Sequence, residues 1–178
     1  MSDDIAQLID QLIEEHKVVG EKAASLEKAV NDASLLSNLK VARDTLVPGD
    51  AAQREGLVRV NEMLTAIEPW LEKHFDREET ALQPAVAQYG SKNLVSAFNS
   101  LLFEHSDLRD RMLHARKRVD ELQGGSLEGP RRDAAARDLR VHINHSRKLL
   151  ETHAARENQL LTELRRHLKK ATRGKEKQ

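Results

Sequence analysis

The sequence predicts an all-α protein, folded as an up-down-up-down four-helix bundle. Charged residues make up 33% of the 178 positions and aromatic residues 3%, and the chain is rich in Ala, Leu, Glu, Lys and Arg. Apolar residues recur at helical spacing along four long segments. Three connections join these segments, which favours antiparallel neighbours. The length suits one domain, predicted at residues 1–172, with a polar tail at 173–178.

The first predicted helix carries an apolar stripe from Ile5 to Val30. Asp3 or Asp4 is available as its N-cap. Residues 31–49 are harder to assign, because their scattered leucines fit either a short packed helix or a structured connection closed by a Pro-Gly turn. The boundaries of this stretch cannot be placed from the pattern.

The second helix is predicted to start at Asp50 and to stop at Gly90. Pro69 lies inside its stripe and should bend the helix, because proline removes one backbone hydrogen bond and crowds the preceding turn. Ser91 is the expected N-cap of a third helix, which runs to the glycine pair at Gly124.

The fourth helix is expected to begin at Pro130, which suits a first helical turn. Its stripe extends to Leu168. The stretch from Lys169 to Gln178 is polar, contains a glycine and has no apolar face, so it is expected to fray. The basic side chains near this end favour a solvated helix terminus over a nucleic-acid site, because acidic residues are interleaved with them.

Six ionisable side chains interrupt the four stripes at positions where the pattern calls for apolar residues. They are His16, His74, Glu78, His105, His153 and Glu157. The second and fourth helices each carry a His and a Glu four residues apart, which places both on one helix face. These two helices run in the same direction in an up-down-up-down bundle, so their pairs can meet at one level of the core.

A metal centre would satisfy these buried groups, which otherwise cost several kcal/mol each. The sequence contains no Cys, so thiolate zinc sites, iron–sulfur clusters and disulfides are excluded, and nitrogen and oxygen must hold any metal. Four imidazoles and two carboxylates exceed what a tetrahedral zinc ion uses and suit two iron ions bridged by Glu78 and Glu157. A bridging oxide or hydroxide would help to offset the charge of the two ions.

The ordered set of motifs resembles the hemerythrin-like HHE cation-binding domains. The matching segments lie at residues 15–16, 74–79, 104–105 and 153–157, and the resemblance spans about residues 4–170. It implies a non-haem di-iron centre that binds dioxygen or related small molecules. The four histidines of the set carry over as terminal ligands, and the two glutamates as bridges. Ferritin-like bundles differ, because they space Glu and His by three residues.

One departure from the oxygen-carrying members concerns Arg109, which stands where they have a second His on the third helix. As one hypothesis, an exchangeable position remains open on one iron and favours reaction with dioxygen, nitric oxide or peroxide. As another, Glu15, Glu79 or Glu104 fills that position. We expect Arg109 itself to reach the surface and to pair with acidic residues.

The remaining histidines are not expected to be ligands. His142 is interpreted as structural, and His114, His145 and His167 as surface or rim residues. Trp70, Phe75, Phe98 and Phe103 are expected to be packing residues, some of which could wall the metal site from water. Ser146 is either a small spacer or a hydroxyl bonded to the preceding turn.

Three functions are compatible with the sequence. The first is a di-iron protein that binds or senses dioxygen, nitric oxide or reactive oxygen species, in stress defence or iron homeostasis. The second is a di-iron oxidoreductase that consumes peroxide, so enzymatic activity is left open, and the third is a metal-free helical interaction bundle. A partner protein is not identifiable, and neither is the oligomeric state.

Several classes of partner and location are disfavoured. Lys plus Arg equals Asp plus Glu at 29 each, so no net field attracts nucleic acid or an anionic membrane. No run of about 18 apolar residues predicts a membrane span. The N-terminal residues lack the basic and apolar regions of a signal peptide, and a cytoplasmic location is expected.

Overall fold

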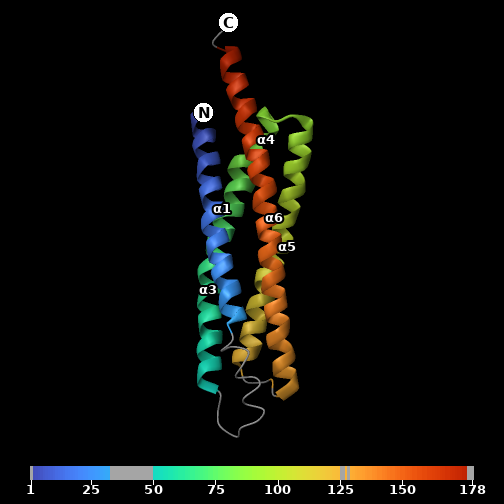
Figure 1. Cartoon of the computed structure of the whole chain (residues 1–178). Helices are drawn as coiled ribbons and strands as arrows, with labels where there is room; N and C mark the ends of the chain where they lie inside the picture. Colours follow the sequence, from blue (N-terminus) through green and yellow to red (C-terminus); the bar gives the residue numbers. More distant parts are fainter. Residues whose placement is uncertain (1, 33–49, 125–126, 128, 176–178) are drawn as a thin grey trace.

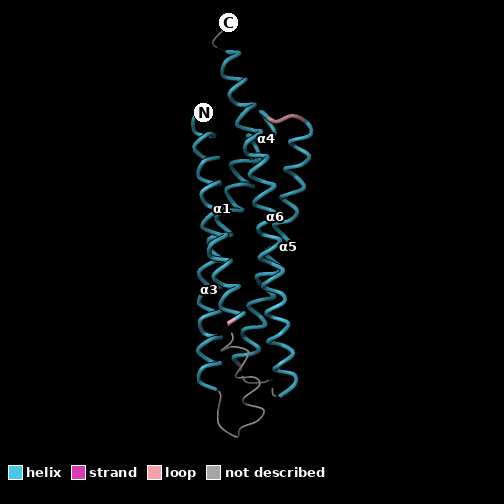
Figure 2. Tube along the Cα trace, viewed as in Figure 1, coloured by secondary structure: helices cyan, strands magenta, loops and turns pink. Residues whose placement is uncertain are grey.

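The computed structural model describes residues 2–32, 50–124, 127 and 129–175. Every regular element in these ranges is helical, and the four long helices α1 (Ser2–Asn31), α3 (Asp50–Arg77), α5 (Lys92–Gln123) and α6 (Gly129–Lys175) lie side by side as an elongated bundle (Figures 1 and 2). Each packs against two neighbours in the cyclic order α1, α3, α5, α6. The prediction of an all-α four-helix bundle is therefore confirmed for the described part of the chain.

Helix α1 begins at Ser2, so Asp3 and Asp4 lie inside its first turn and not before it. The Asp4 carboxylate remains favourably placed, because the helix N-terminus carries partial positive charge. The stretch at residues 33–49, for which the sequence left helix and connection open, lies outside the described residues.

The predicted second helix is divided into three segments. Helix α3 continues through Pro69 to Arg77, and the five residues Glu78–Leu82 then form a π-helical turn, η1, before helix α4 (Gln83–Tyr89). The N–H of Gln83 accordingly donates to the carbonyl of Glu78, five residues back. The prediction of one α-helix from Asp50 to Gly90 was therefore wrong at η1, and the bend expected at Pro69 stays a prediction.

The predicted breaks between the later helices are confirmed. Gly90 ends α4 in an extended conformation, and a Cβ at this position would meet the Val86 carbonyl oxygen at 2.5 Å. The Ser91 side chain accepts a hydrogen bond from the backbone N–H of Leu94 and caps α5. Gly124 closes α5 at the other end.

Helix α6 extends further than expected at both ends. It starts at Gly129, whose φ of +49° lies in the left-handed region that glycine adopts readily, and it reaches Lys175. The helix thus continues past residue 172, where the tail was predicted to begin, and residues 169–175 are helical. Straight-chain basic residues have good helix propensity, which outweighs the missing apolar face here. The division into a domain at 1–172 and a tail stays a prediction.

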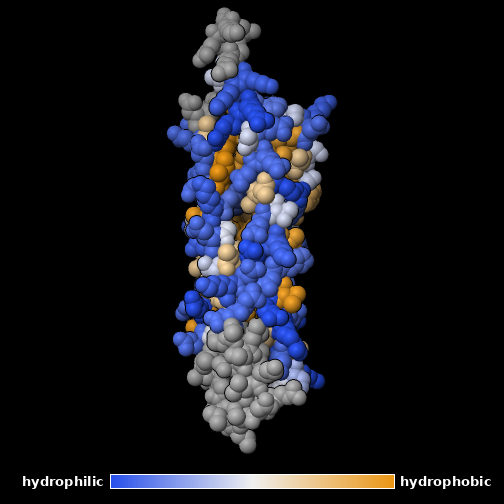
Figure 3. Space-filling model, in the orientation of Figure 1, coloured by the Kyte–Doolittle hydropathy of each residue, from blue (hydrophilic) through white to orange (hydrophobic). Residues whose placement is uncertain are grey.

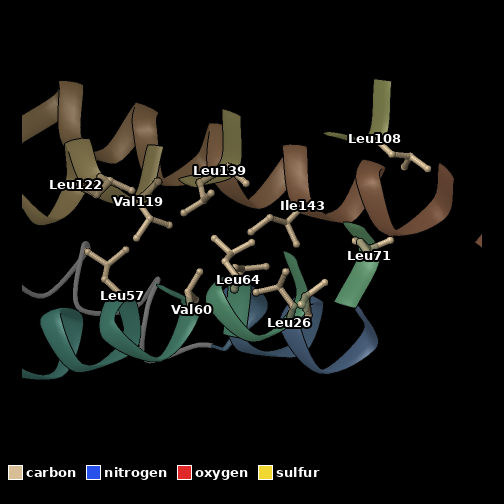
Figure 4. Close-up of a cluster of buried hydrophobic side chains, with 14 of the residues drawn as sticks. Leu26, Leu57, Val60, Leu64, Leu71, Leu108, Val119, Leu122, Leu139 and Ile143 are labelled. Atoms are coloured by element: carbon tan, nitrogen blue, oxygen red, sulfur yellow. The ribbon is translucent and has the colours of Figure 1, made fainter. Parts of the chain in front are cut away.

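The buried apolar residues form two separate clusters along the bundle. The larger cluster fills the half that contains the start of α3 and the end of α5, and ten of its residues are labelled in Figure 4. The smaller cluster fills the other half, around Ile9, Leu12, Leu94, Phe98 and Leu164. Between the two clusters lies a layer of buried polar side chains, which interrupts the core at one level.

The outer surface is largely hydrophilic on the face seen in Figure 3, with small separate apolar patches. Phe103 is 82% exposed, so its predicted role as a packing residue was wrong, whereas Phe75 and Phe98 are buried. Within the described residues, no helix has both the length and the hydropathy that crossing a membrane requires.

Candidate metal centre

All six predicted ligand residues meet in the polar layer between the two apolar clusters. Each is at most 8% exposed, and together with Glu15 they are the buried polar or charged residues of the described chain. The rings of His16 and His74 lie 4.7 Å apart between centroids, and those of His105 and His153 lie 5.1 Å apart. Four helices therefore bring together residues separated by up to 141 positions in the sequence.

The donor atoms form two overlapping groups. His16, His74, Glu78 and Glu157 offer ligand atoms that all lie within 4.8 Å of one another, and Glu78, His105 and His153 form a second such group. Glu78 belongs to both. Glu157 also approaches both histidine pairs, because its Oε2 lies 2.9 Å from His16 Nε2 and 3.7 Å from His153 Nε2. Two carboxylates thus stand between two pairs of imidazoles.

Several of these donor atoms have no hydrogen-bond partner although they are buried. They are Glu78 Oε1, Glu157 Oε1, His105 Nε2 and His153 Nε2. His105 Nε2 lies 3.0 Å from Glu78 Oε2, and His74 Nε2 lies 2.6 Å from Glu78 Oε1, but neither pair has hydrogen-bond geometry. Unpaired buried lone pairs are costly, so their convergence fits a cation held by nitrogen and oxygen. The residues present therefore fit the metal that the sequence predicts.

The outward-facing nitrogens of the four imidazoles are all hydrogen-bonded. Nδ1 of His74 lies 2.9 Å from Glu15, Nδ1 of His105 lies 2.8 Å from Glu79, and Nδ1 of His153 lies 3.1 Å from Glu104. His16 instead donates from Nδ1 to the side-chain oxygen of Asn158 at 3.0 Å. These partners place a proton on Nδ1 and leave Nε2 to face the centre, which is the tautomer a metal ligand needs.

Three arginines hold the three outer carboxylates. Arg77 pairs with Glu15, Arg109 with Glu79, and Arg156 with Glu104. Burial opposes ionisation of Glu15 and Glu79, but the arginine and histidine partners outweigh it and lower the pKa of both carboxyls below the usual value. His74, His105 and His153 are thus each hydrogen-bonded to a carboxylate that is itself held by an arginine.

The four Nδ1 hydrogen bonds form a closed ring around the bundle. Glu15 joins α1 to α3, Glu79 joins η1 to α5, Glu104 joins α5 to α6, and Asn158 joins α6 back to α1. Every bond crosses between neighbouring helices. The orientation of each ring therefore depends on the helix beside it.

These outer partners correct one of the sequence hypotheses. Glu15, Glu79 and Glu104 were candidates to fill the position left by Arg109, but each is engaged with the Nδ1 side of a histidine. Their adjacency to His16, Glu78 and His105 in the sequence is a signal that could have suggested an outer role. The sequence alone did not say which histidine each would serve.

Arg109 and Phe75 close one side of the centre. The Arg109 guanidinium pairs with Glu72 and Glu79, as expected for a residue reaching the surface, and its Cζ lies 5.0 Å from the centre of the Phe75 ring. Phe75 in turn stacks on His105 with centroids 4.0 Å apart and planes 16° apart. The place of a further third-helix ligand is therefore occupied by a stack of Arg109, Phe75 and His105.

The opposite side is hollowed. A cavity of about 260 Å³ lies between α1 and α6, and His16, His74 and His153 line it together with the small residues Gly20 and Ala154. A Cβ at Gly20 would meet nothing within 4 Å. The imidazole layer can therefore be approached by a small molecule from this side of the bundle.

Burial and mutual charge set the protonation of the centre. Burial, reinforced by the charge of Glu157, raises the pKa of Glu78 to about 8. Burial lowers the pKa of His74 and His153. Burial also opposes protonation of His16, but the hydrogen bond and the electrostatic attraction to Glu157 outweigh burial and raise the pKa of His16. Both ring nitrogens of His16 face oxygen acceptors, Nδ1 that of Asn158 and Nε2 that of Glu157, which is why its protonated form is favoured.

The remaining histidines lie outside the two donor groups, as predicted. His142 donates from Nε2 to the backbone carbonyl of Arg111 at 2.9 Å, so its contact is structural. Ser146 bonds the carbonyl of His142 four residues back, the second of the two roles considered for it. His145 is exposed, and His114 and His167 are partly exposed.

The family model described as hemerythrin HHE cation binding domain matches residues 34–164, a range that includes five of the six predicted ligands. His16 precedes this range, but the structure places it beside His74. No curated protein and no solved structure matches the chain. From the match over most of its length, together with the buried His and Glu cluster, the chain belongs to the hemerythrin HHE cation-binding domain family.

Proposed function

We propose that this protein is a non-haem di-iron protein that binds or responds to dioxygen, nitric oxide or reactive oxygen species. The observation that carries the proposal is the pair of overlapping donor groups joined through Glu78. One metal ion held by the larger group would leave His105 and His153 unused. Two ions would use them all, with both carboxylates shared.

The proposed ligand assignment follows from the two donor groups. His16 and His74 would hold one iron, and His105 and His153 the other, with Glu78 and Glu157 between them. Nitrogen and carboxylate oxygen ligands without sulfur suit iron better than they suit a soft metal. When bound, such a pair supplies electrons for redox chemistry and an open coordination position for a small ligand.

The residues of this chain contribute positioning and shielding. Glu15, Glu79 and Glu104 orient three of the imidazoles through Nδ1 and make them better electron donors. Phe75 covers His105 on the α3–α5 side, while the hollow between α1 and α6 would admit a ligand. This arrangement supports reaction with a small molecule more than it supports storage of a large mineral.

The testing experiment is metal analysis of the purified protein by mass spectrometry, together with optical spectra. The spectra are recorded after anaerobic Fe(II) reconstitution and again after exposure to air, to nitric oxide and to peroxide. We expect two irons per chain and an absorption band that disappears on reduction and returns with air. The variant His145→Ala, which removes an exposed histidine outside the cluster, controls for adventitious binding and should keep both irons.

The outcomes separate the competing functions. A spectrum that changes on gas binding without turnover supports a binder or sensor, whereas steady consumption of peroxide identifies a di-iron oxidoreductase. A folded helical protein that takes up no iron under anaerobic conditions would contradict the proposal. The metal-free interaction bundle would then be the better account.

A further inference from the structure

A second cavity lies in the apolar core immediately below the imidazole layer. It has a volume of about 40 Å³ and is lined by residues from all four long helices. Five of these residues, Leu26, Leu64, Leu71, Leu108 and Ile143, are labelled in Figure 4. The cavity is distinct from the larger hollow that reaches the histidines.

The lining of this cavity is almost wholly apolar. Its polar members are Arg111, Ser146 and Arg147, at the margin of the bundle. The Ser146 hydroxyl is bonded to a backbone carbonyl, Arg111 pairs with an aspartate on its own helix, and Arg147 pairs with glutamates of α1 and α6. A water molecule needs two to four polar partners, so a cavity of this kind stays dry and accepts apolar guests.

The size of the cavity limits what it can hold. One water-sized sphere occupies about 10–15 Å³ on the same measure, so 40 Å³ accommodates roughly three such centres. A diatomic molecule fits this space, whereas an organic substrate does not. Hydrogen peroxide is of similar size, but it would lose its hydrogen bonds to water without replacing them.

The cavity is also close to the imidazoles. Leu71, Leu108 and Leu150 line it, and each stands three residues from a histidine of the layer, which is about 4.5 Å along a helix axis. Ala23 and Leu150 line both this cavity and the hollow that His16, His74 and His153 face. The side chains of one small residue and one leucine therefore form the wall that the two spaces share.

We propose that this apolar cavity is a docking site for an apolar diatomic molecule, dioxygen or nitric oxide, which passes between Ala23 and Leu150 to reach the metal centre. The use of the molecule at the centre rests on the proposed function, but its binding in the cavity does not. The inference narrows the ligand to an apolar gas and disfavours peroxide. It also assigns a role to a space that close packing would otherwise fill.

Xenon is the appropriate probe, because it is apolar, chemically inert and binds dry cavities of this kind. Crystals of the full chain, metal-free and iron-loaded, are pressurised with xenon, and the anomalous signal locates the atom. We expect one xenon site surrounded by Leu64, Ile143 and Ala115 in both forms. Binding in solution is followed by the change in xenon NMR shift.

Two matched substitutions test the location. Ala115→Leu places extra side-chain atoms in the cavity and should remove the xenon site, and it should slow the rise of the gas-dependent optical signal in the iron-loaded protein. Ala136→Leu makes the same change at a buried alanine of the same core that does not line the cavity, and it should leave the site in place. If Ala115→Leu does not fold, Ile143→Ala provides a second test, because enlarging the cavity should increase xenon occupancy.

The result that overturns the inference is specific. Absence of xenon from the cavity, or a xenon site that persists in Ala115→Leu, would show that the space is not a docking site. Iron content is measured on the same samples. Two irons without bound xenon would overturn only this inference, whereas bound xenon in a chain that takes up no iron would overturn only the proposed function.

Discussion

Glu104 holds the imidazole of His153 across the interface between α5 and α6, with Oε2 at 3.1 Å from Nδ1. In the sequence Glu104 adjoins a different histidine of the cluster, His105. The same crossing occurs at Glu15, which precedes His16 but is bonded to His74. An acid next to one proposed ligand therefore orients a ligand on the neighbouring helix.

Loss of one outer carboxylate should weaken metal binding without emptying the site. In Glu104→Gln, the ring of His153 keeps an acceptor but loses the negative charge that raises its basicity. We expect metal affinity to fall by about 10–100-fold. The measurement is an anaerobic competition titration of Fe(II) or Co(II) against a chelating dye.

The matched control is Glu68→Gln. Glu68 forms a comparable ion pair with Arg116 between α3 and α5, but it contacts no histidine of the cluster. The metal affinity of the Glu68→Gln variant should equal that of the wild type. Equal losses in the two variants would mean that Glu104 acts through general stability and not through His153.

The two donor groups should be separable by stoichiometry. His105→Ala leaves the group of His16, His74, Glu78 and Glu157 complete, so one metal ion per chain should remain. Glu78→Ala removes a donor from both groups and should reduce binding at both positions. Metal content by mass spectrometry after reconstitution and desalting checks the difference. Retention of two ions in Glu78→Ala would contradict the shared role of this carboxylate.

Stability of the chelated, metal-free protein should depend on pH through Glu78. Its pKa is about 8 in the folded protein, and the ordinary value is 4.5. Between these two values the folded state holds a proton that the unfolded state has released, so the free energy of unfolding falls as pH rises. The contribution is complete below about pH 4.5 and is lost by about pH 8, and it amounts to a few kcal/mol as an order of magnitude.

Glu78→Gln isolates this contribution from those of the neighbouring histidines. The amide stays neutral, so the difference between variant and wild type should grow in favour of the variant from pH 5 to pH 8.5. Urea unfolding followed by circular dichroism at several pH values measures it. A difference that does not change with pH would show that Glu78 ionises normally in the metal-free protein.

Phe75 should matter to the metal as well as to the core. Phe75 and Phe98 are each 1% exposed. Replacing either ring by the smaller side chain of leucine, as in Phe75→Leu or Phe98→Leu, should lower the free energy of unfolding by roughly 1–3 kcal/mol. Only Phe75 stacks on His105, so only Phe75→Leu should alter the optical spectrum of the loaded protein. Denaturant titration and the spectrum of each variant provide the two readouts. A spectral change of the same size in Phe98→Leu would contradict a local role for the stacked ring.

The ligand layer could be predicted from the sequence because helical periodicity determines it. A His and a Glu four residues apart lie on one face of a helix. The apolar stripe identifies the face that points into the core, and because the His and Glu lie within that stripe, they are predicted to point into the core as well. All six residues are brought together as predicted. Whether they bind iron stays a prediction that metal analysis can decide.

The outer contacts could not be predicted in the same way. Glu79 contacts His105 because of the π-helical turn at Glu78–Leu82 and the distance to α5. The spacing of apolar residues in the sequence predicts neither of these. No signal in the sequence indicated the π-helical turn, which begins nine residues after Pro69, and the bend expected at Pro69 itself stays a prediction. Arg109 was placed correctly, because a long charged side chain at a core edge reaches for acidic partners.

The closed ring of four Nδ1 hydrogen bonds also constrains how the bundle can move. Each helix is tied to both of its neighbours at one level, so sliding or rotating any one helix would break two ties at once. The layer therefore restrains the four helices at the middle of the bundle. The two apolar clusters on either side of it lie outside this ring and can open locally. Slow amide exchange should concentrate at the centre of the bundle, and the ends should open without disturbing the metal layer.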